Sequence, residues 1–173
     1  MKRQAIRHEG DTAENRFLEL VKGSMKSDNS KRGDALVPYK GSMRYVEIKE
    51  CHSDTINQVR AVKYIPLIIY TGDGSAPWIV IPPQEVVRLV ATKSRGQHTE
   101  VPFESANLSK KRLPIGLHAS DANLDQSVRT AIEKGEKFTE VEEVMNLLIK
   151  KLQILNRLTK RKVKQAARLT PPQ

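Results

Sequence analysis

The sequence predicts an α/β protein in which helices flank a mixed central sheet and a long helical extension follows at the C-terminus. Short apolar runs rich in β-branched residues alternate with helical patterns over residues 12–92, which is typical of a sheet covered by helices. Residues 139–169 contain neither glycine nor proline, so one long helix is expected there. We therefore divide the chain into a core domain, residues 1–115, and a helical extension, residues 116–173.

The first predicted elements are a helix and a pair of strands. Apolar residues recur at helical spacing over 12–22, and Gly23 ends this helix. Strands follow at about 34–39 and 43–50, separated by a tight turn at 40–42. Apolar and polar residues alternate along the second strand, so one of its faces is expected to be buried.

The next four elements would complete the mixed sheet. A capping residue precedes a helix predicted over roughly 54–63. The β-branched run 64–70 is typical of a buried strand, and a glycine-rich turn separates it from a returning strand over 78–81. A proline pair then opens a helix over about 83–92, because proline is tolerated in a first helical turn.

The C-terminal part of the chain is predominantly helical. Residues 95–114 are polar and show no periodicity that selects a helix or a strand, whereas a short helix is expected over 121–134. The long helix over 139–169 carries apolar residues at steps of three, four and seven, which form one stripe. This stripe would either pack on the core or form a dimer seam. Its members are Val141, Val144, Met145, Leu148, Leu152, Leu155 and Leu158.

Composition limits where the protein works and what it binds. A formal net charge of +10 over 173 residues favours phosphate polymers or anionic membranes as partners. The single cysteine, Cys51, excludes a disulfide framework within the chain and fits a reducing compartment. No run of about 18 apolar residues exists, and no apolar stretch follows the basic N-terminus. We therefore expect a cytoplasmic protein without a membrane partner.

Three residues of the predicted strand pair form the strongest candidate site. Asp34 stands at the start of the first strand, and Glu47 and Lys49 lie two apart on the second. Residues i and i+2 of a strand point to the same side, and a hairpin would bring Asp34 alongside them. Two carboxylates beside a lysine can hold a divalent cation and position a water molecule. The alternative is that Glu47 and Lys49 form an incidental pair on an exposed edge strand.

At these residues the sequence resembles the PD-(D/E)XK nuclease superfamily, which includes type II restriction endonucleases and archaeal Holliday-junction resolvases. The resemblance covers roughly residues 10–93, in motif and element order rather than in extended identity. It implies a restriction-endonuclease-like fold in which Asp34 and Glu47 bind Mg²⁺, with Mn²⁺ as a substitute. It also implies that Lys49 positions or activates the attacking water.

The resemblance extends to neighbouring positions with less specificity. Glu14, in the first predicted helix, is the best match to a further acidic metal ligand, ahead of Glu19. Gly33 stands where the family's name has proline, and that position has a structural role. Gln58 and Tyr64 are loosely similar to a polar pair that some members place after the strand with the second acid and the lysine.

Basic and amide residues outside this triplet are candidates for nucleic-acid contacts. Basic residues near it can hold phosphates, with simple solubility charge as the alternative; they are Lys26, Lys31, Arg32, Lys40 and Arg44. Within residues 95–107, Gln97, His98 and Asn107 can read base edges, or cap helices and satisfy a buried loop. No acidic residue follows Glu143, and we expect this basic helix to bind nucleic acid, with a solvated helix face or an anionic membrane surface as the alternatives. Its basic residues include Lys160, Arg161, Lys162 and Lys164.

These features together predict a Mg²⁺-dependent DNA endonuclease of the restriction or homing type. A Holliday-junction resolvase is the alternative within the same class, because such enzymes are also small, basic and dimeric. A non-catalytic DNA-binding protein on the same fold is the alternative from another class. Because cutting both strands of a duplex usually needs two sites, we expect a homodimer, with the C-terminal helix as a possible interface.

Overall fold

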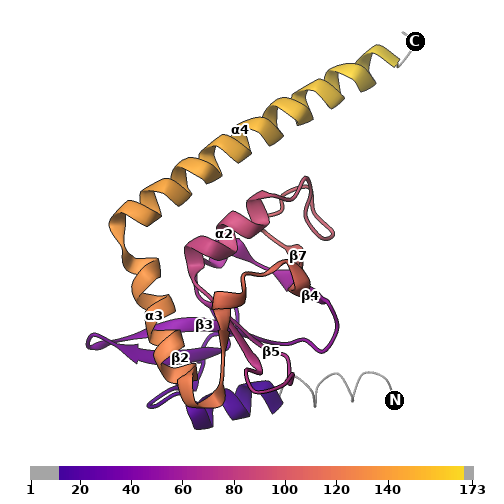
Figure 1. Ribbon diagram of the computed structural model, residues 1–173. Helices are drawn as coiled ribbons and strands as arrows, with labels where there is room; N and C mark the ends of the chain where they lie inside the picture. Colours follow the sequence, from indigo (N-terminus) through magenta and orange to yellow (C-terminus); the bar gives the residue numbers. More distant parts are fainter. Residues whose placement is uncertain (1–11, 170–173) are drawn as a thin grey trace.

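The computed structural model describes residues 12–169, without the side chains of 138–141, 163–164 and 166–169. The chain has a mixed α/β fold, with a six-stranded mixed sheet and a separate two-stranded sheet (Figure 1). In spatial order the large sheet contains β1 (Met25–Lys26), β2 (Ala35–Tyr39), β3 (Ser42–Glu50), β5 (Leu67–Tyr70), β6 (Trp78–Ile81) and β8 (His118–Ala119). The small sheet pairs β4 (Thr55–Val59) with β7 (Ala106–Ser109).

Strands β2 and β3 form the predicted hairpin. Their antiparallel register runs from Tyr39 opposite Ser42 to Ala35 opposite Val46. Gly41 adopts a φ of 77° in the connecting turn, a conformation that is easy for glycine because it has no Cβ atom. Strand β3 then pairs with β5 in parallel, while every other neighbouring pair in this sheet is antiparallel.

A parallel pair requires a crossover connection, and here the predicted helix over 54–63 is wrong. The segment forms β4 and a single 3-10 turn, η1 (Ala61–Lys63). The register of β4 shifts between Ile56 and Val59, so both side chains are buried although they lie three residues apart. A bulge in a strand can thus imitate the i, i+3 spacing of a helix.

The other predicted helices are present. The N-terminal helix spans residues 12–20, and the others are α2 (Pro83–Ala91), α3 (Leu124–Glu136) and α4 (Phe138–Leu169). The predicted strand over 64–70 begins only at Leu67, because Tyr64 adopts a positive φ of 48° that ends the η1 turn. Further 3-10 turns are η2 (Lys110–Arg112), η3 (Ile115–Leu117) and η4 (Asp121–Asn123).

Side chains alternate between the two faces of the large sheet and fill two cores. On one face, Ile69 of β5 and Ile79 of β6 pack with α2 and with the small sheet. On the other face, Ile68 and the fully buried Trp78 pack with the N-terminal helix and α3. Strand β8 and helix α3 lie beyond the predicted boundary at residue 115, yet they extend this sheet and its second core.

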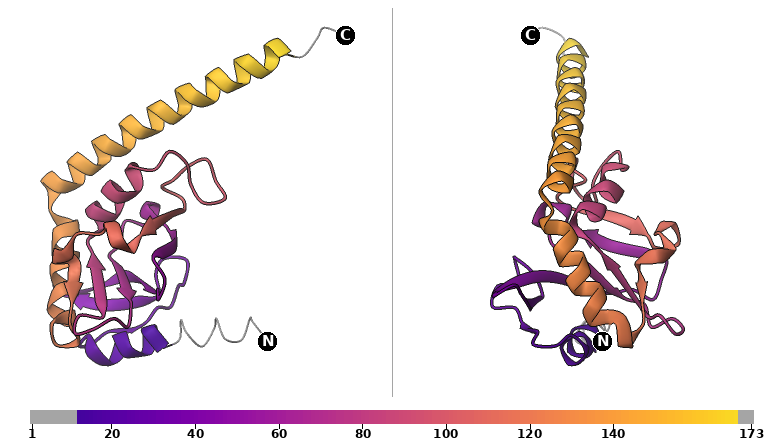
Figure 2. Two further views of the ribbon diagram at one scale, coloured as in Figure 1. Left: turned by 45° about the vertical axis from the view of Figure 1, so that its right-hand side comes forward. Right: turned by 60° about the vertical axis from the view of Figure 1, so that its left-hand side comes forward.

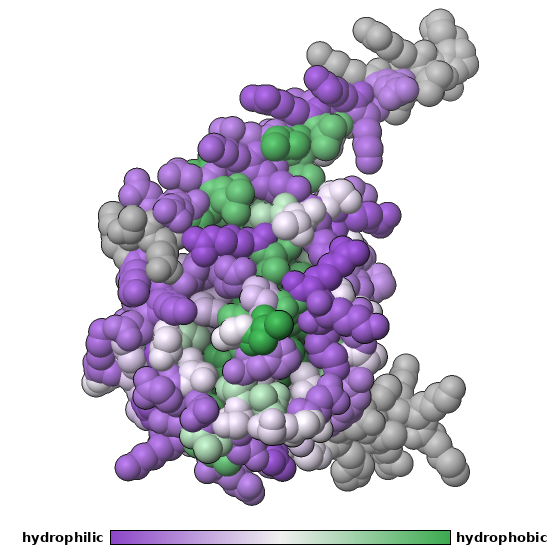
Figure 3. All heavy atoms as spheres, in the orientation of Figure 1, coloured by the Kyte–Doolittle hydropathy of each residue, from purple (hydrophilic) through white to green (hydrophobic). Residues whose placement is uncertain are grey.

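Helix α4 starts beside the body and then runs away from it (Figures 1 and 2). Val144 is buried in the first core, and Leu148 packs against that core. Further along, apolar patches lie exposed among polar side chains (Figure 3). In the described part of the chain, no helix combines the length and the apolar character needed to cross a membrane.

Candidate active site

The candidate site lies at the open end of the β2–β3 hairpin, away from its turn. Asp34 immediately precedes β2, and its N–H donates to the carbonyl oxygen of Val46 at 2.9 Å. This bond continues the register that pairs Ala35 with Val46, so Asp34 lies opposite Glu47 on β3. Lys49 follows on the same side of β3. The structure therefore brings Asp34, Glu47 and Lys49 together.

The Asp34 carboxylate is oriented by the backbone of the neighbouring strand. Its Oδ2 atom accepts a hydrogen bond of 2.8 Å from the Ile48 N–H. Burial raises the pKa of Asp34 above its ordinary value, and the charge of Glu47 adds to the rise, while the Ile48 hydrogen bond and the nearby lysines oppose it. A desolvated carboxylate beside a second carboxylate is an environment in which a bound cation would be favourable.

Lys49 contributes a largely buried amine to the same site. Its side chain is 20% exposed, and its Nζ atom lies 3.9 Å from Oε1 of Glu47. Burial lowers the pKa of Lys49, whereas the attraction of Glu47 and Asp34 opposes that change. A lysine whose pKa is lowered by burial can exchange protons or hold a water molecule more readily than an exposed lysine.

The structure adds Lys63, which the sequence did not indicate. Lys63 ends η1, just before β5, and its Nζ atom donates to Oε2 of Glu47 at 2.5 Å. The two side chains are only 11% and 13% exposed. Lys63 lies within the segment predicted as a helix, so the periodicity of strand β3 did not predict that it would be close to Glu47. The parallel pairing of Glu47 with Leu67 of β5 is what brings it close.

The turn that carries Lys63 is held from both ends. The N–H of Val62 donates to the Phe103 carbonyl oxygen at 2.9 Å, and the N–H of Tyr64 donates to that of Ala61 at 3.0 Å. Arg60, which precedes the turn, is exposed, and its positive charge further lowers the pKa of Lys49. The sequence did not single out Arg60.

Asp34 and Glu47 offer two carboxylates, so a divalent cation here would need several other ligands. Within the described residues, no group of three or more Asp, Glu, His or Cys side chains could hold a metal. Asp34 uses Oδ2 and Glu47 uses Oε2 in hydrogen bonds of 2.8 and 2.5 Å. A cation would therefore use Oδ1 of Asp34 and Oε1 of Glu47, the latter 3.9 Å from the Lys49 amine. One or two carboxylates, with water and substrate phosphate, are the usual Mg²⁺ ligands.

Glu14 is not brought into this carboxylate pair. Its Oε2 atom lies 4.0 Å from Nζ of Lys26 on β1 in an ion pair, and no third acid joins Asp34 and Glu47 within the described residues.

The glycine at position 33 has a steric explanation. A Cβ atom there would lie 2.8 Å from the Val46 carbonyl oxygen and 3.1 Å from Cβ of Tyr45. Only glycine lets the chain approach β3 this closely.

The basic residues predicted around the motif lie on β1, before β2 and on the β2–β3 hairpin. Lys31 is exposed, and the Arg32 guanidinium lies over the Tyr45 ring at 4.4 Å. Lys40 lies at the hairpin turn, roughly 17–20 Å from Asp34 at about 3.4 Å per strand residue. Nε of Arg44 donates to Glu136 of α3 at 2.6 Å. Of these residues, Lys31 and Arg32 are exposed and lie nearest to Asp34 along the chain.

The segment 95–107 supports the crossover connection. Oε1 of Gln97 and Oδ1 of Asn107 accept hydrogen bonds of 2.9 and 3.3 Å from the N–H of Gln58. Their acceptor atoms therefore hold the bulge in β4, as the buried-loop alternative implies. His98 is exposed with a positive φ of 63°. Within residues 12–169 it takes part in no hydrogen bond.

Helix α4 presents the predicted basic run to solvent. Lys160, Arg161 and Lys162 are exposed, far along the part of α4 that leaves the body (Figure 2). The backbone of Lys164 belongs to the helix, but its side chain lies outside the described residues. This basic run is therefore separate from the carboxylate pair within one chain.

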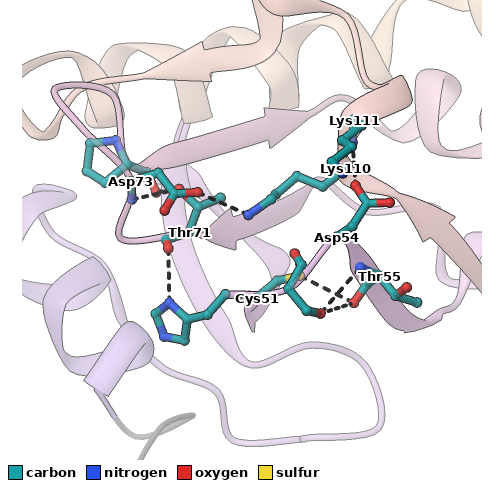
Figure 4. Close-up of polar contacts among 10 residues, drawn as sticks. Cys51, Asp54, Thr55, Thr71, Asp73, Lys110 and Lys111 are labelled. Carbon is teal, nitrogen blue, oxygen red and sulfur yellow. Dashed lines mark hydrogen bonds and ion pairs between the residues drawn. The ribbon is translucent and has the colours of Figure 1, made fainter.

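The loop that follows Lys49 is tied to two other loops (Figure 4). Asp54 accepts hydrogen bonds of 2.9 Å from the Lys111 N–H and from the Ser109 hydroxyl. The Lys110 amine lies 3.0 Å from the Asp73 carboxylate, and the thiol of Cys51 donates to backbone oxygens of its own loop. Cys51 is thus a buried structural residue.

Comparison with protein-family models and with curated proteins finds no match to this chain.

Proposed function

We propose that this protein is a metal-dependent DNA endonuclease with a restriction-endonuclease-like core. The observation that carries the proposal is the convergence of the Asp34 and Glu47 carboxylates with the Lys49 amine at the end of one hairpin. A small sequence-specific enzyme of the restriction or homing type is the form we favour. The net charge of +10 supports a polyanionic substrate.

The order of elements is compatible with the nuclease resemblance. The N-terminal helix, the β2–β3 hairpin, strands β5 and β6, and helix α2 follow one another along the chain. The departure is the crossover, where β4 and η1 replace a helix. This departure leaves the hairpin with its three polar residues intact, and it supplies Lys63 to the same site.

The proposed reaction is hydrolysis of a phosphodiester. The oxygen of a water molecule forms a new bond to phosphorus, the bond from phosphorus to one sugar oxygen breaks, and that oxygen leaves with a proton. The products are a phosphate monoester and a hydroxyl group. Lys49 would hold the attacking water by a hydrogen bond. Mg²⁺ or Mn²⁺ held by Asp34 and Glu47 would neutralise charge on the phosphate oxygens.

The decisive experiment compares cleavage of supercoiled plasmid and of a four-way junction, with Mg²⁺ or with EDTA. We expect the wild type to cut plasmid DNA only with the metal. Asp34→Asn and Lys49→Met should each lower the rate by roughly 100-fold or more, because each removes a group at the reacting phosphate.

Lys137→Gln is the matched control, since Lys137 is exposed on the connection between α3 and α4 and the change removes one positive charge away from the site. Its rate should stay close to that of the wild type. Cleavage of neither substrate by the wild type would overturn the enzyme proposal in favour of a DNA-binding protein. Unchanged cleavage by both site variants would overturn the site assignment, and cleavage of the junction alone would identify a resolvase.

A homodimer would supply the two sites needed for cutting both strands. Exposed apolar side chains recur along α4 at Met145, Ile149 and Leu152, which are 46–50% exposed. Their spacing of four and then three residues places them on one helix face. We propose that this face packs against a second copy of the chain, with the basic run beyond it available to DNA.

A further inference from the structure

Beside Lys49 the surface opens into a polar pocket of about 520 Å³. It is lined by residues 49–53, which leave strand β3, and by residues 55–58 of strand β4. The reacting phosphate of the proposed nuclease would lie at the Lys49 end. The pocket is therefore the space that a nucleotide next to that phosphate would enter.

The far wall of the pocket carries two side-chain amides, Asn57 and Gln58. Both residues are exposed, although they lie in the middle of a strand whose Ile56 and Val59 are buried. The shift of register between Ile56 and Val59 produces this arrangement, because the bulge turns two consecutive side chains outward. In the described part of the chain, neither amide group takes part in a hydrogen bond.

The backbone at Gln58 is held in an unusual conformation. Its φ of 53° lies in the left-handed region, which residues other than glycine rarely adopt. Its N–H is held by two side-chain acceptors, Oε1 of Gln97 at 2.9 Å and Oδ1 of Asn107 at 3.3 Å. Gln97 is in turn fixed by its own N–H, which donates to the Ser105 carbonyl oxygen at 2.7 Å.

On the side of the pocket formed by residues 49–53, His52 is also held by hydrogen bonds. The ring nitrogens of His52 lie 3.0 Å from the Thr71 carbonyl oxygen and 2.7 Å from Oε1 of Glu50. The Glu50 side chain is only 9% exposed, and its Oε1 atom is the one that His52 contacts. Hydrogen bonds thus hold the backbone at Gln58 and the ring of His52, and the amides of Asn57 and Gln58 are exposed at the pocket between them.

We infer that Asn57 and Gln58 read a DNA base next to the phosphate at Lys49, and that Gln97 and Asn107 are positioning residues for this contact. An amide side chain offers one donor and one acceptor side by side, which matches the N7 and N6 edge of adenine. The pocket thus has a lysine at one end, which would bind a phosphate, and amides at the other end, which would bind a base. Together these groups would bind one nucleotide. This inference rests on the proposed function and adds a base preference to it.

The test selects bound duplexes from a random-sequence DNA pool and reads them by sequencing. Ca²⁺ replaces Mg²⁺ in this selection, because the experiment requires binding without cleavage. The wild type should enrich one base at a defined position. Asn57→Ala and Gln58→Ala should each lower that enrichment by roughly 5- to 150-fold, the range for one base contact, while total binding at low salt persists. Gln97→Ala should reproduce the Gln58→Ala result, because it releases the Gln58 backbone.

Asn123→Ala is the matched control, since it removes an exposed amide outside the pocket, and its selected pool should match that of the wild type. Unchanged enrichment in both pocket variants, or no base preference in the wild type, would overturn the inference. A base preference lost in the variants, from a protein that cuts no DNA, would overturn the proposed enzyme while supporting the pocket as a base-reading site.

Discussion

Lys63 donates a 2.5 Å hydrogen bond to Glu47, although strand β4 and a turn separate the two residues along the chain. Both side chains are nearly buried. Lys49 approaches the same carboxylate from its own strand, with 3.9 Å between Nζ and Oε1. Glu47 is therefore oriented by two lysines from different elements, with Oε2 in the shorter contact and Oε1 in the longer one.

Replacing Lys63 with methionine should destabilise the protein. Removing one partner of a buried ion pair leaves an uncompensated charge, which costs about 3–5 kcal/mol; because Lys49 still attracts Glu47, we expect a smaller loss, about 1–3 kcal/mol. Urea unfolding at pH 7 measures it. Lys63→Arg, which keeps the charge, should retain most of the stability. If Glu47→Gln relieves none of the Lys63→Met loss in a double-mutant cycle, the two residues are not coupled.

Gly33→Ala should destabilise the hairpin end that carries Asp34. The new Cβ atom would lie 2.8 Å from the Val46 carbonyl oxygen, so the backbone must move at a cost of about 1–3 kcal/mol. Gly116→Ala is the control, because nothing lies within 4 Å of a Cβ atom there. Thermal unfolding of the two variants should show a loss for Gly33→Ala alone, and equal melting temperatures would contradict the steric explanation.

Much of the fold could be predicted because local patterns and tertiary packing agree. The β2–β3 hairpin follows from its turn and its alternating residues, and α2 follows from its proline start and helical spacing. The crossover could not be predicted this way. Ile56 and Val59 have helical spacing, but a bulge puts them on one face of a strand, and the partner strand β7 lies about 50 residues further along. Long-range pairing of this kind leaves no local signal.

The same distinction applies to the candidate site. Asp34, Glu47 and Lys49 lie on one hairpin, so strand periodicity and a short turn are enough to predict their proximity. Lys63 reaches Glu47 because β3 and β5 are parallel neighbours. A sequence pattern that assigns its segment to a helix cannot show this. Sequence reasoning also named Glu14 as a ligand, whereas the structure pairs it with Lys26.

Stability should fall in acid partly through Asp121. Hydrogen bonds from Arg16 and from the Trp78 indole N–H, the latter at 2.7 Å, lower the pKa of Asp121. Because the folded-state pKa is below the unfolded value of about 3.9, this carboxylate stabilises the fold above pH 4, and the contribution is lost as pH falls through the folded-state pKa. Asp121→Asn should reduce stability at pH 7 and flatten its fall between pH 5 and 3. Parallel pH profiles for variant and wild type would contradict this role.

Leu152→Glu should convert the expected dimer to a monomer. Leu152 is 48% exposed on the apolar face of α4, and a charge buried in a helix–helix seam is unfavourable unless it is paired. Analytical ultracentrifugation over a range of concentrations measures the change. Gln153→Glu adds the same charge at the next, exposed position and should leave the dimer intact. A wild type that sediments as a monomer at all concentrations would contradict the seam.

Neutralising the exposed basic run of α4 should weaken DNA binding in a salt-dependent manner. If Lys160, Arg161 and Lys162 each contact a phosphate, changing all three to glutamine removes the release of about 0.9 counterions per contact. The slope of log affinity against log salt should then decrease by about 1–3 units. A control triple variant at Lys111, Arg112 and Lys137, which are also exposed, makes the same change in net charge. Equal slopes for the two variants would show that α4 contributes only general charge, whereas a loss confined to the α4 variant would place DNA along this helix.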